Sequence, residues 1–237
     1  MGQKKLIRFA AIAGYPHVLQ YPTGMMGNWS TVYKNGNPIT LELACGKGEY
    51  AVGLGRMHPE HNFLGVDVKG NRIYIGAKQA LTEGLTNVAF LRTQIDKIAE
   101  YFAPGEVSEI WLTFPDPQLR ISRAKKRLTH PRYLRMYQQF LRPGGYIHLK
   151  TDSPVLYRFT NKVIGMYGLT LHEDLDDVFA QPEVGPELKI RTHYEGLDIA
   201  GSARIHYLRF SLPATPLPDL DETLYEQVRQ EEDGGPL

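Results

Sequence analysis

The amino-acid sequence predicts an α/β fold in which helices cover both faces of a mostly parallel sheet. Short apolar runs alternate with segments of helical periodicity, which is the pattern of repeated strand–helix units. Turn or cap residues flank each run, as they usually flank strands. The chain has 237 residues, of which 42% are hydrophobic, so it can bury a substantial core. We expect a central domain over residues 39–212, between an N-terminal arm (1–38) and a Pro-rich acidic tail (213–237).

The expected strands are short and are bounded by turn residues. The main apolar runs are Ile39–Leu43, Asn62–Val66, Asn87–Leu91, Val107–Phe114 and Tyr146–Lys150. Two later segments, Leu169–Leu171 and Ile205–Leu212, are candidates for a closing hairpin. Sheets of this kind bind ligands at the carboxyl ends of strands, where the strand order switches. Functional residues are therefore expected directly after the apolar runs.

Two helices are indicated by their first residues. Thr129-His130-Pro131 supplies a cap hydroxyl and a proline suited to the first turn, and Ser153-Pro154 opens a second helix. Apolar residues recur along the first at helical spacing, namely Tyr133, Met136, Tyr137, Phe140 and Leu141. Pro143-Gly144-Gly145 is expected to end that helix.

Composition narrows the class of protein. The Gly, Pro and Tyr residues of the N-terminal arm predict an irregular segment, and the tail is expected to hold a short helix near Leu224 or to be partly disordered. No run of about 18 apolar residues occurs, so no membrane span is expected. Cys45 is the one cysteine, so no internal disulfide can form, and a reducing cytoplasm is the simplest compartment.

The net charge of +1 conceals one strongly basic segment. Between Pro117 and Thr151 the sequence has no Asp or Glu. The basic residues there are Arg120, Arg123, Lys125, Lys126, Arg127, Arg132, Arg135, Arg142 and Lys150. Such a segment can bind nucleic-acid phosphates through Coulomb attraction and counterion release. A solvated basic surface with no ligand is the alternative.

A glycine-rich turn follows the first apolar run, over Glu42–Glu49. Gly46 and Gly48 fit the spacing of a nucleotide-binding turn, and Asp67 after the second run is suited to hold ribose hydroxyls. On the glycines alone, NAD and S-adenosylmethionine are equally acceptable. Glu42 and Glu49 would repel a pyrophosphate, but they favour an ammonium and a sulfonium. The charges therefore favour S-adenosylmethionine, and a tight turn without a ligand is the alternative.

A second constellation ends the fourth run, at Phe114-Pro115-Asp116-Pro117. Proline fixes one backbone angle and restricts the residue before it, so Asp116 is presented rigidly at a strand end. The basic segment follows at once. A fixed carboxylate can accept hydrogen bonds from N1 and N2 of guanine, while Arg and Lys hold the phosphates of a nucleic acid.

Taken in order, these motifs make the chain resemble the tRNA (guanine-N7-)-methyltransferase family of the bacterial type. The resemblance covers roughly residues 25–212. The matching segments are Gly27-Asn28-Trp29, Asn37-Pro38-Ile39, the Glu42–Gly48 turn, Gly65-Val66-Asp67, Tyr101–Glu106, Phe114–Pro117, Lys126-Arg127-Leu128-Thr129, Pro143-Gly144-Gly145, Lys150-Thr151-Asp152 and Thr192-His193-Tyr194-Glu195. The Phe-Pro-Asp-Pro, Lys-Thr-Asp and Thr-x-Tyr-Glu segments are far more specific than the glycine turn.

The resemblance implies a Rossmann-like, S-adenosylmethionine-dependent methyltransferase fold with a seven-stranded sheet, acting on a guanosine in the variable loop of tRNA. The implied cofactor-binding residues are Glu42, Gly46, Gly48, Asp67, Gln94 and Asp116. Those implied to face the guanine are Arg120, Asp152, Thr192 and Glu195. The expected phosphate contacts are Arg123, Lys125, Lys126 and Arg127.

The sequence departs from the family pattern at three places. Position 94 is Gln instead of Asp or Asn, although its amide oxygen can still accept a hydrogen bond from an adenine amino group. After Pro117 the usual Trp-Pro-Lys-Lys is replaced by Gln118-Leu119-Arg120-Ile121, which keeps one cation. Asp67 stands where Glu is more usual, with a shorter reach to the same hydroxyls.

The expected catalysis is mainly positioning, because guanine N7 has a free lone pair and loses no proton when it is methylated. Asp116 is the expected catalytic residue, holding the base and stabilising the positive ring that forms. The scattered histidines show no metal-site spacing, so no metal is expected. The oligomeric state is open between monomer and homodimer. The alternatives are a methyltransferase for another acceptor, a catalytically weak RNA-binding scaffold, and an NAD-dependent oxidoreductase.

Overall fold

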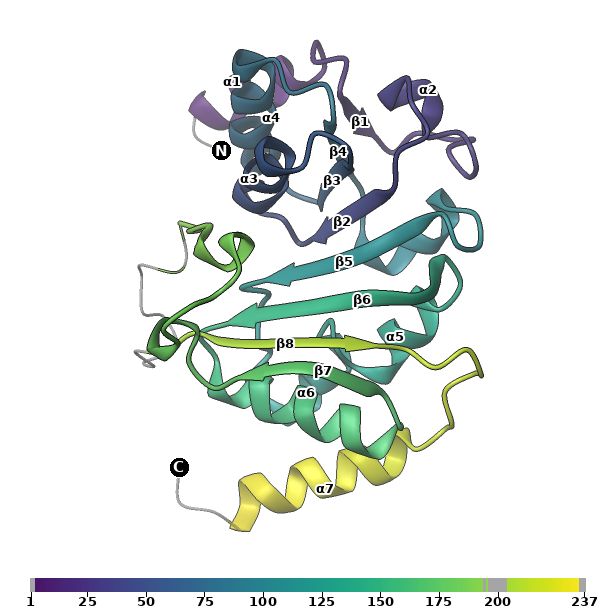
Figure 1. Ribbon diagram of the computed structural model, residues 1–237, viewed down its shortest axis with the longest axis vertical. Helices are drawn as coiled ribbons and strands as arrows, with labels where there is room; N and C mark the ends of the chain where they lie inside the picture. The colour runs from purple at the N-terminus through teal and green to yellow at the C-terminus, as the bar shows by residue number, and fades with distance from the viewer. Residues whose placement is uncertain (1–2, 194, 196–203, 235–237) are drawn as a thin grey trace.

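A mostly parallel sheet runs through the centre of the protein (Figure 1). The structure, a computed structural model, describes residues 3–193, 195 and 204–234. The strands are β1 (Val18–Gln20), β2 (Ile39–Leu43), β3 (Asn62–Asp67), β4 (Val88–Arg92), β5 (Val107–Thr113), β6 (Leu141–Thr151), β7 (Thr170–Leu175) and β8 (His206–Ser211). Within the described residues they form one eight-stranded sheet in the order β1-β4-β3-β2-β5-β6-β8-β7.

The strand order explains where a ligand site can form. β2 lies between β3 and β5 and is parallel to both, with Glu42 opposite Gly65 on one side and Trp111 on the other. The chain first builds outward from β2 through β3 and β4, and it then returns to add β5 and β6 on the other side. The order therefore switches between β2 and β5, where such sheets bind ligands. The five main apolar runs are the strands β2 to β6, which confirms the predicted α/β fold.

The two late strand candidates pair with each other, although they do not form a tight hairpin. β8 is antiparallel to β7 and to β6 and lies between them. A long connection over residues 176–205 joins β7 to β8. The described part of this connection includes the short 3-10 helices η3 (Val178–Ala180) and η4 (Pro186–Lys189), and it reaches back toward β2 and β5 (Figure 1).

Helices follow most of the strands. They are α1 (Gln3–Ile12), α2 (Ser30–Tyr33), α3 (Glu49–Met57), α4 (Gly70–Glu83), α5 (Pro131–Tyr137), α6 (Pro154–Met166) and α7 (Asp221–Gly234), with 3-10 helices η1 (Ile95–Tyr101) and η2 (Ile121–Lys126). Both predicted helix starts are confirmed, with Pro131 and Pro154 in the first turns. No helix among the described residues is long and apolar enough to cross a membrane.

Two details of the helix prediction were wrong. The cap of α5 is the His130 ring, which accepts from the Arg132 amide at 3.1 Å, while the Thr129 hydroxyl bonds to that of Thr160. α5 also ends at Tyr137, and Leu141 already opens β6. The apolar spacing misled because Phe140, in the turn after the helix, and Leu141, at the start of β6, enter the same core as the helix.

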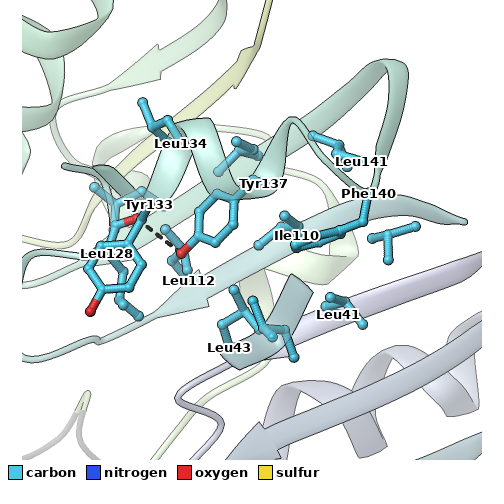
Figure 2. Packing of buried hydrophobic residues seen from close by; sticks show 14 of the residues in the cluster. Leu41, Leu43, Ile110, Leu112, Leu128, Tyr133, Leu134, Tyr137, Phe140 and Leu141 are labelled. Carbon is cyan, nitrogen blue, oxygen red and sulfur yellow. Dashed lines mark hydrogen bonds between the residues drawn. The ribbon is translucent and has the colours of Figure 1, made fainter. Parts of the chain in front are cut away.

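The core has one layer on each face of the sheet. Leu41 and Leu43 of β2 point to the face covered by α5 and α6, whereas Phe63 and Trp111 belong to the layer packed beneath α3 and α4. Figure 2 shows Tyr133 and Tyr137 of α5 lying over Leu43 and its neighbours from β5. In this layer the Tyr137 hydroxyl donates to the Leu128 carbonyl at 3.1 Å, so the ring packs without leaving a buried donor unpaired.

The N-terminal arm is more ordered than its composition predicts. Helix α1 packs on α4 and buries Ile12 completely, and β1 extends the sheet by parallel pairing with β4. The expectation of an irregular segment was therefore wrong for these parts. The extra edge strand also explains why the sheet has eight strands instead of the expected seven. The division into arm, domain and tail stays a prediction.

The acidic tail folds back on the sheet's helical layer. The expected helix near Leu224 is confirmed as α7, which runs beside α6 (Figure 1). Leu217, Leu224 and Val228 enter the main core, and Asp221 pairs with Arg135 at 2.8 Å. The described part of the tail is therefore a packed element and not a free acidic arm.

Candidate active site

A cavity of about 870 Å³ opens at the carboxyl ends of β2 to β6. It lies at the switch in strand order, as expected for an open α/β sheet. The predicted site residues in its described lining are Glu42, Asp67, Gln94, Asp116, Asp152 and Thr192. Each of the first five lies at or just after the carboxyl end of a different strand, and Thr192 comes from the long connection between β7 and β8. The sheet thus brings together residues that are up to 150 positions apart.

The turn after β2 bends the backbone sharply before α3 begins. Ala44, Gly46 and Gly48 all have positive φ angles, of 59°, 55° and 72°. A Cβ on Gly48 would lie 2.4 Å from the Phe90 ring, so a larger residue is excluded by space as well as by conformation. Ala44 adopts this conformation at some cost, because its side chain disfavours the left-handed region. The turn therefore brings the backbone close to the cavity at a point that the core beneath it fixes.

Glu42 is a buried carboxylate at the floor of the cavity, with 3% of the residue exposed. It accepts hydrogen bonds from the Ala51 amide and from the Thr113 hydroxyl, both at 2.8 Å. Burial raises the pKa of Glu42 to about 8, against the lowering effect of these two hydrogen bonds; Glu49 and Asp67 add to the rise. A cation placed here would relieve the burial cost and the mutual repulsion of the carboxylates.

Asp67 is held in place by the turn it faces. Its carboxylate accepts from the Gly46 amide at 3.0 Å and from the Lys69 amide at 2.7 Å. Both bonds use backbone donors, so the side chain is fixed without a neutralising cation in those contacts. Cys45 lies close by and is buried, which raises the pKa of its thiol well above the ordinary range. Its thiol is thus kept neutral, as expected of a packing residue and not of a nucleophile.

Asp116 is exposed to solvent in the opposite wall of the cavity. The chain leaves β5 through Phe114, whose positive φ of 48° bends the backbone before Asp116. The Phe114 amide donates to the Lys150 carbonyl at 2.8 Å, which fixes the start of this bend. The Asp116 carboxylate accepts from the Gln118 amide at 3.0 Å. This bond uses the Oδ1 atom of Asp116. The carboxylate is therefore presented to the cavity by a rigid loop, as the two flanking prolines predict.

The basic residues predicted to touch phosphate separate into two groups. Arg123, Lys125 and Lys126 are exposed on η2. Arg127 is 1% exposed; it donates to the Pro117 and Gln118 carbonyls at 3.1 Å, and its guanidinium lies 4.5 Å from the centre of the Phe159 ring. The structure therefore places Arg127 beneath the Asp116 loop as a support and does not place it on the exposed basic surface of η2.

The residues predicted to face the guanine are also divided. Asp152 and Thr192 line the cavity. Arg120 is exposed at the start of η2, outside the described lining. Glu195 is turned away into a salt bridge with Lys150, at 3.0 Å, with 6% of its side chain exposed. Tyr194 lies outside the described residues.

Some residues that shape the site were not predicted. Thr113 holds Glu42, Lys150 holds Glu195, and Tyr133 lines the cavity next to Asp96, which pairs with Arg132. The position of Lys150 in the sequence could have indicated its role, because a lysine at the end of a run of buried strand residues needs a buried partner. Among the described residues, no cluster of three or more His, Cys, Asp or Glu side chains is arranged to hold a metal ion.

Comparison with known proteins identifies relatives over most of the chain. A family model described as "Putative methyltransferase" matches residues 36–198. A tRNA (guanine-N(7)-)-methyltransferase of Porphyromonas gingivalis is 48% identical over 210 residues, which are 84% of this chain and 85% of that protein. Enzymes with the same name from Bacteroides thetaiotaomicron and Christiangramia forsetii are 46% and 42% identical, over 90% of this chain and 87% and 100% of their own lengths.

Solved structures with the same fold are more distant in sequence. The 16S rRNA methyltransferase KamB superposes with a TM-score of 0.60 at 15% identity, over 83% of this chain and 99% of that one. A mutant 16S rRNA (adenine(1408)-N(1))-methyltransferase from Catenulisporales acidiphilia, solved with cosubstrate SAM, gives a TM-score of 0.54 at 16% identity, over 80% and 93% of the two chains. At these identities the likeness establishes the methyltransferase fold alone.

Proposed function

Because the chain belongs to the tRNA (guanine-N(7)-)-methyltransferase family, we propose that it transfers a methyl group from S-adenosylmethionine to N7 of a guanine in the variable loop of tRNA. One observation carries the proposal most directly. A single cavity joins the buried carboxylate of Glu42, which favours a cation, to the exposed carboxylate of Asp116 beside the basic helix η2. Donor and base can therefore meet in one place.

The residues on the β2 side of the cavity fit S-adenosylmethionine. When bound, this cofactor supplies an electrophilic methyl group on a positively charged sulfur. Glu42 and Glu49 offer negative charge for its ammonium or sulfonium, and Asp67 is set to accept hydrogen bonds from ribose hydroxyls. Gln94 lines the same wall after β4, where its amide oxygen can accept from an adenine amino group. Gly46 and Gly48 lie outside the described lining and would act by shaping the turn, whose residues Ala44 and Cys45 line this wall.

Asp116 is the proposed catalytic residue because it presents a free carboxylate edge at a rigid loop. This edge can accept from N1 and N2 of guanine, which orients the base and places negative charge near a ring that becomes positive. The protein needs no general base for this step, because guanine N7 attacks the methyl group with a free lone pair and loses no proton. Asp152 and Thr192 would hold the other side of the base, and Arg120 would approach it from the start of η2. Catalysis is then mainly orientation and exclusion of water.

The RNA would be held by its phosphates on η2. Arg123, Lys125 and Lys126 are exposed there, next to the cavity wall that carries Asp116. Their contacts would be sequence-independent and sensitive to salt. The guanine is then selected by its fit in the cavity. The proposal includes S-adenosylhomocysteine as product, no metal requirement, a cytoplasmic location, and either a monomer or a homodimer.

The direct test is methyl transfer from labelled S-adenosylmethionine to unmodified tRNA, with the modified nucleoside identified by mass and chromatography. We expect 7-methylguanosine, and a variable-loop guanosine when the modified position is mapped. Saturable cofactor binding without label in tRNA would move the activity to another methyl acceptor. If S-adenosylmethionine does not bind and tRNA does, the protein is an RNA-binding scaffold.

A further inference from the structure

Lys150, near the carboxyl end of β6, is a fully enclosed cation, with 0% of its side chain exposed, two residues before Asp152 of the cavity lining. Its ammonium donates to the Leu188 carbonyl at 2.8 Å, to the Ile190 carbonyl at 3.1 Å and to the Glu195 carboxylate at 3.0 Å. An ammonium has three protons, so these three acceptors saturate it. Lys150 therefore makes no further hydrogen bond to a substrate in this arrangement.

The surroundings show that the pair with Glu195 belongs to the interior. The Glu195 side chain is 6% exposed, and the rings of Tyr50 and Phe114 lie 5.4 and 5.7 Å from the Lys150 nitrogen. Burial lowers the pKa of Lys150, and Glu195 counteracts that effect. Removing one partner of such a pair leaves a buried charge without compensation, which is far more harmful than losing an exposed ion pair.

The three acceptors lie on both sides of Thr192, which lines the cavity. Leu188 and Ile190 precede it and Glu195 follows it, so one ammonium holds both ends of this stretch. The Glu195 amide also donates to the Thr192 hydroxyl oxygen at 3.2 Å, which orients the hydroxyl and leaves its proton to donate elsewhere. The position of Thr192 thus depends on where Glu195 is fixed.

The backbone of Lys150 also contacts the segment that carries Asp116. Its carbonyl accepts from the Phe114 amide at 2.8 Å, at the turn that carries Asp116. Two residues further along the chain is Asp152, which also lines the cavity. Lys150 therefore links the three segments that present Asp116, Asp152 and Thr192.

From this geometry we propose that Lys150 is a positioning residue for the guanine, and that Glu195 acts through Lys150 without touching the base. The inference rests on the proposed function and deepens it. It revises the role that family resemblance implies for Glu195, and it adds a residue that resemblance did not assign. The Lys150–Glu195 pair is an anchor that keeps Thr192 at the cavity, and the neighbouring His193 amide donates to the Glu49 carboxylate at 3.3 Å on the other side of this stretch.

The experiment compares Glu195→Ala with Glu195→Gln. Glutamine keeps an oxygen that can accept from Lys150, so Glu195→Gln should retain a kcat/KM on tRNA within about threefold of the wild type, whereas Glu195→Ala should lower kcat/KM by roughly 10²-fold through misplacement of Thr192. S-adenosylhomocysteine should bind both variants as it binds the wild type. A carboxylate that touched guanine would need two acceptor oxygens, so equal losses in the two variants would overturn the proposal.

Lys150→Met supplies the second arm, because methionine fills a similar length without the charge. It should lose about as much activity as Glu195→Ala, and the double variant should lose no more than either alone, since partners in one interaction are not additive. Losses that multiply would overturn the proposal. Lys189→Met is the matched control, since Lys189 is an exposed lysine on the same connection, and it should match the wild type. If Lys150→Met does not fold, the two Glu195 variants decide alone.

A second readout separates this inference from the proposed function. If the wild-type protein methylates no tRNA, the proposed function fails, and hydrogen exchange at residues 188–193 still tests the anchor. Faster exchange in Glu195→Ala than in Glu195→Gln supports it, and equal exchange overturns it. If the wild type is active and Glu195→Ala keeps a normal kcat/KM on tRNA, the inference fails while the proposed function stands.

Discussion

The two walls of the cavity are built in different ways, and Glu42 and Asp116 show the contrast. Glu42 is buried and accepts two hydrogen bonds from groups of the core, whereas Asp116 is exposed and accepts one from its own loop. The wall of Glu42 is a strand, a turn and a helix in continuous sequence. The wall of Asp116 is held from outside, by Arg127 beneath the loop and by Lys150 at its start. The Glu42 wall is therefore fixed by buried contacts of the core, including Thr113 of β5, whereas the Asp116 wall is an exposed loop that Arg127 and the Lys150 backbone support.

The largest effect that this contrast predicts is in Asp116→Ala. The side chain is exposed, so the melting temperature should stay near that of the wild type. Loss of the group that orients the base should lower kcat/KM on unmodified tRNA by roughly 10³-fold, the scale on which removal of a transition-state contact acts. S-adenosylhomocysteine should still bind. Glu60→Ala, an exposed acid far from the cavity lining, serves as control, and near-normal turnover of Asp116→Ala would remove this residue from the mechanism.

Glu42→Gln should have the opposite effect to Asp116→Ala: it should weaken the binding of S-adenosylmethionine and leave the binding of tRNA nearly unchanged. The variant keeps the size of the side chain but loses the charge that faces a cationic ligand. Weakening of a buried charged contact by about 2 kcal/mol or more corresponds to a rise in the Kd for S-adenosylmethionine of roughly 30-fold. The Kd for tRNA should change little. Calorimetric titration with each ligand measures both Kd values. If the binding of both ligands is weakened equally, the two walls do not act independently.

The sequence predicted the placement of the residues in the Glu42 wall better than that of the residues around Asp116, and the reason is physical. Glu42 lies in the first apolar run, Asp67 directly follows the second, and neighbouring glycines mark the turn, so short windows contain most of the signal, although the Thr113 partner of Glu42 is 71 positions away. The pairing of Lys150 with Glu195 spans 45 positions, and no local pattern records it. Arg127 and Lys126 are adjacent in one basic run, yet one is buried and the other exposed, because that difference depends on Phe159 and on the path of the loop.

The same limit applies to the fold. Strands β2 to β6 were predicted because their apolar runs are buried on both faces of the sheet. β1 has three half-buried residues and becomes a strand through its pairing with β4. Its sequence alone carries no strand periodicity over so short a length. Tertiary contacts therefore supply the edge of the sheet, just as they support the loop of Asp116.

A smaller effect is the pH dependence of stability and of cofactor binding that the raised pKa of Glu42 predicts. Its pKa is raised to about 8 in the folded protein from 4.5. Between these values the folded state binds a proton that the unfolded state releases, so this contribution to stability is present below pH 4.5 and is lost as pH rises through about 8. A cationic ligand favours the ionised carboxylate, so binding should release protons near pH 7. Calorimetry in two buffers of different ionisation enthalpy measures the release, and Glu42→Gln should show less of it. An equal release in the variant would place the proton elsewhere.

The smallest effect distinguishes the neighbours Lys126 and Arg127. Loss of one exposed phosphate contact in Lys126→Ala should weaken tRNA binding several-fold and reduce the slope of log K against log salt by about 0.7 to 0.9, because one fewer counterion is released. Arg127→Met removes the support of the Asp116 loop from a buried position, so it should lower the melting temperature and kcat while leaving that slope unchanged. Binding isotherms at several salt concentrations decide between the two roles. A reduced slope in Arg127→Met would mean that its guanidinium leaves the Phe159 ring to meet RNA, and the base wall would then rearrange on binding while the cofactor wall would not.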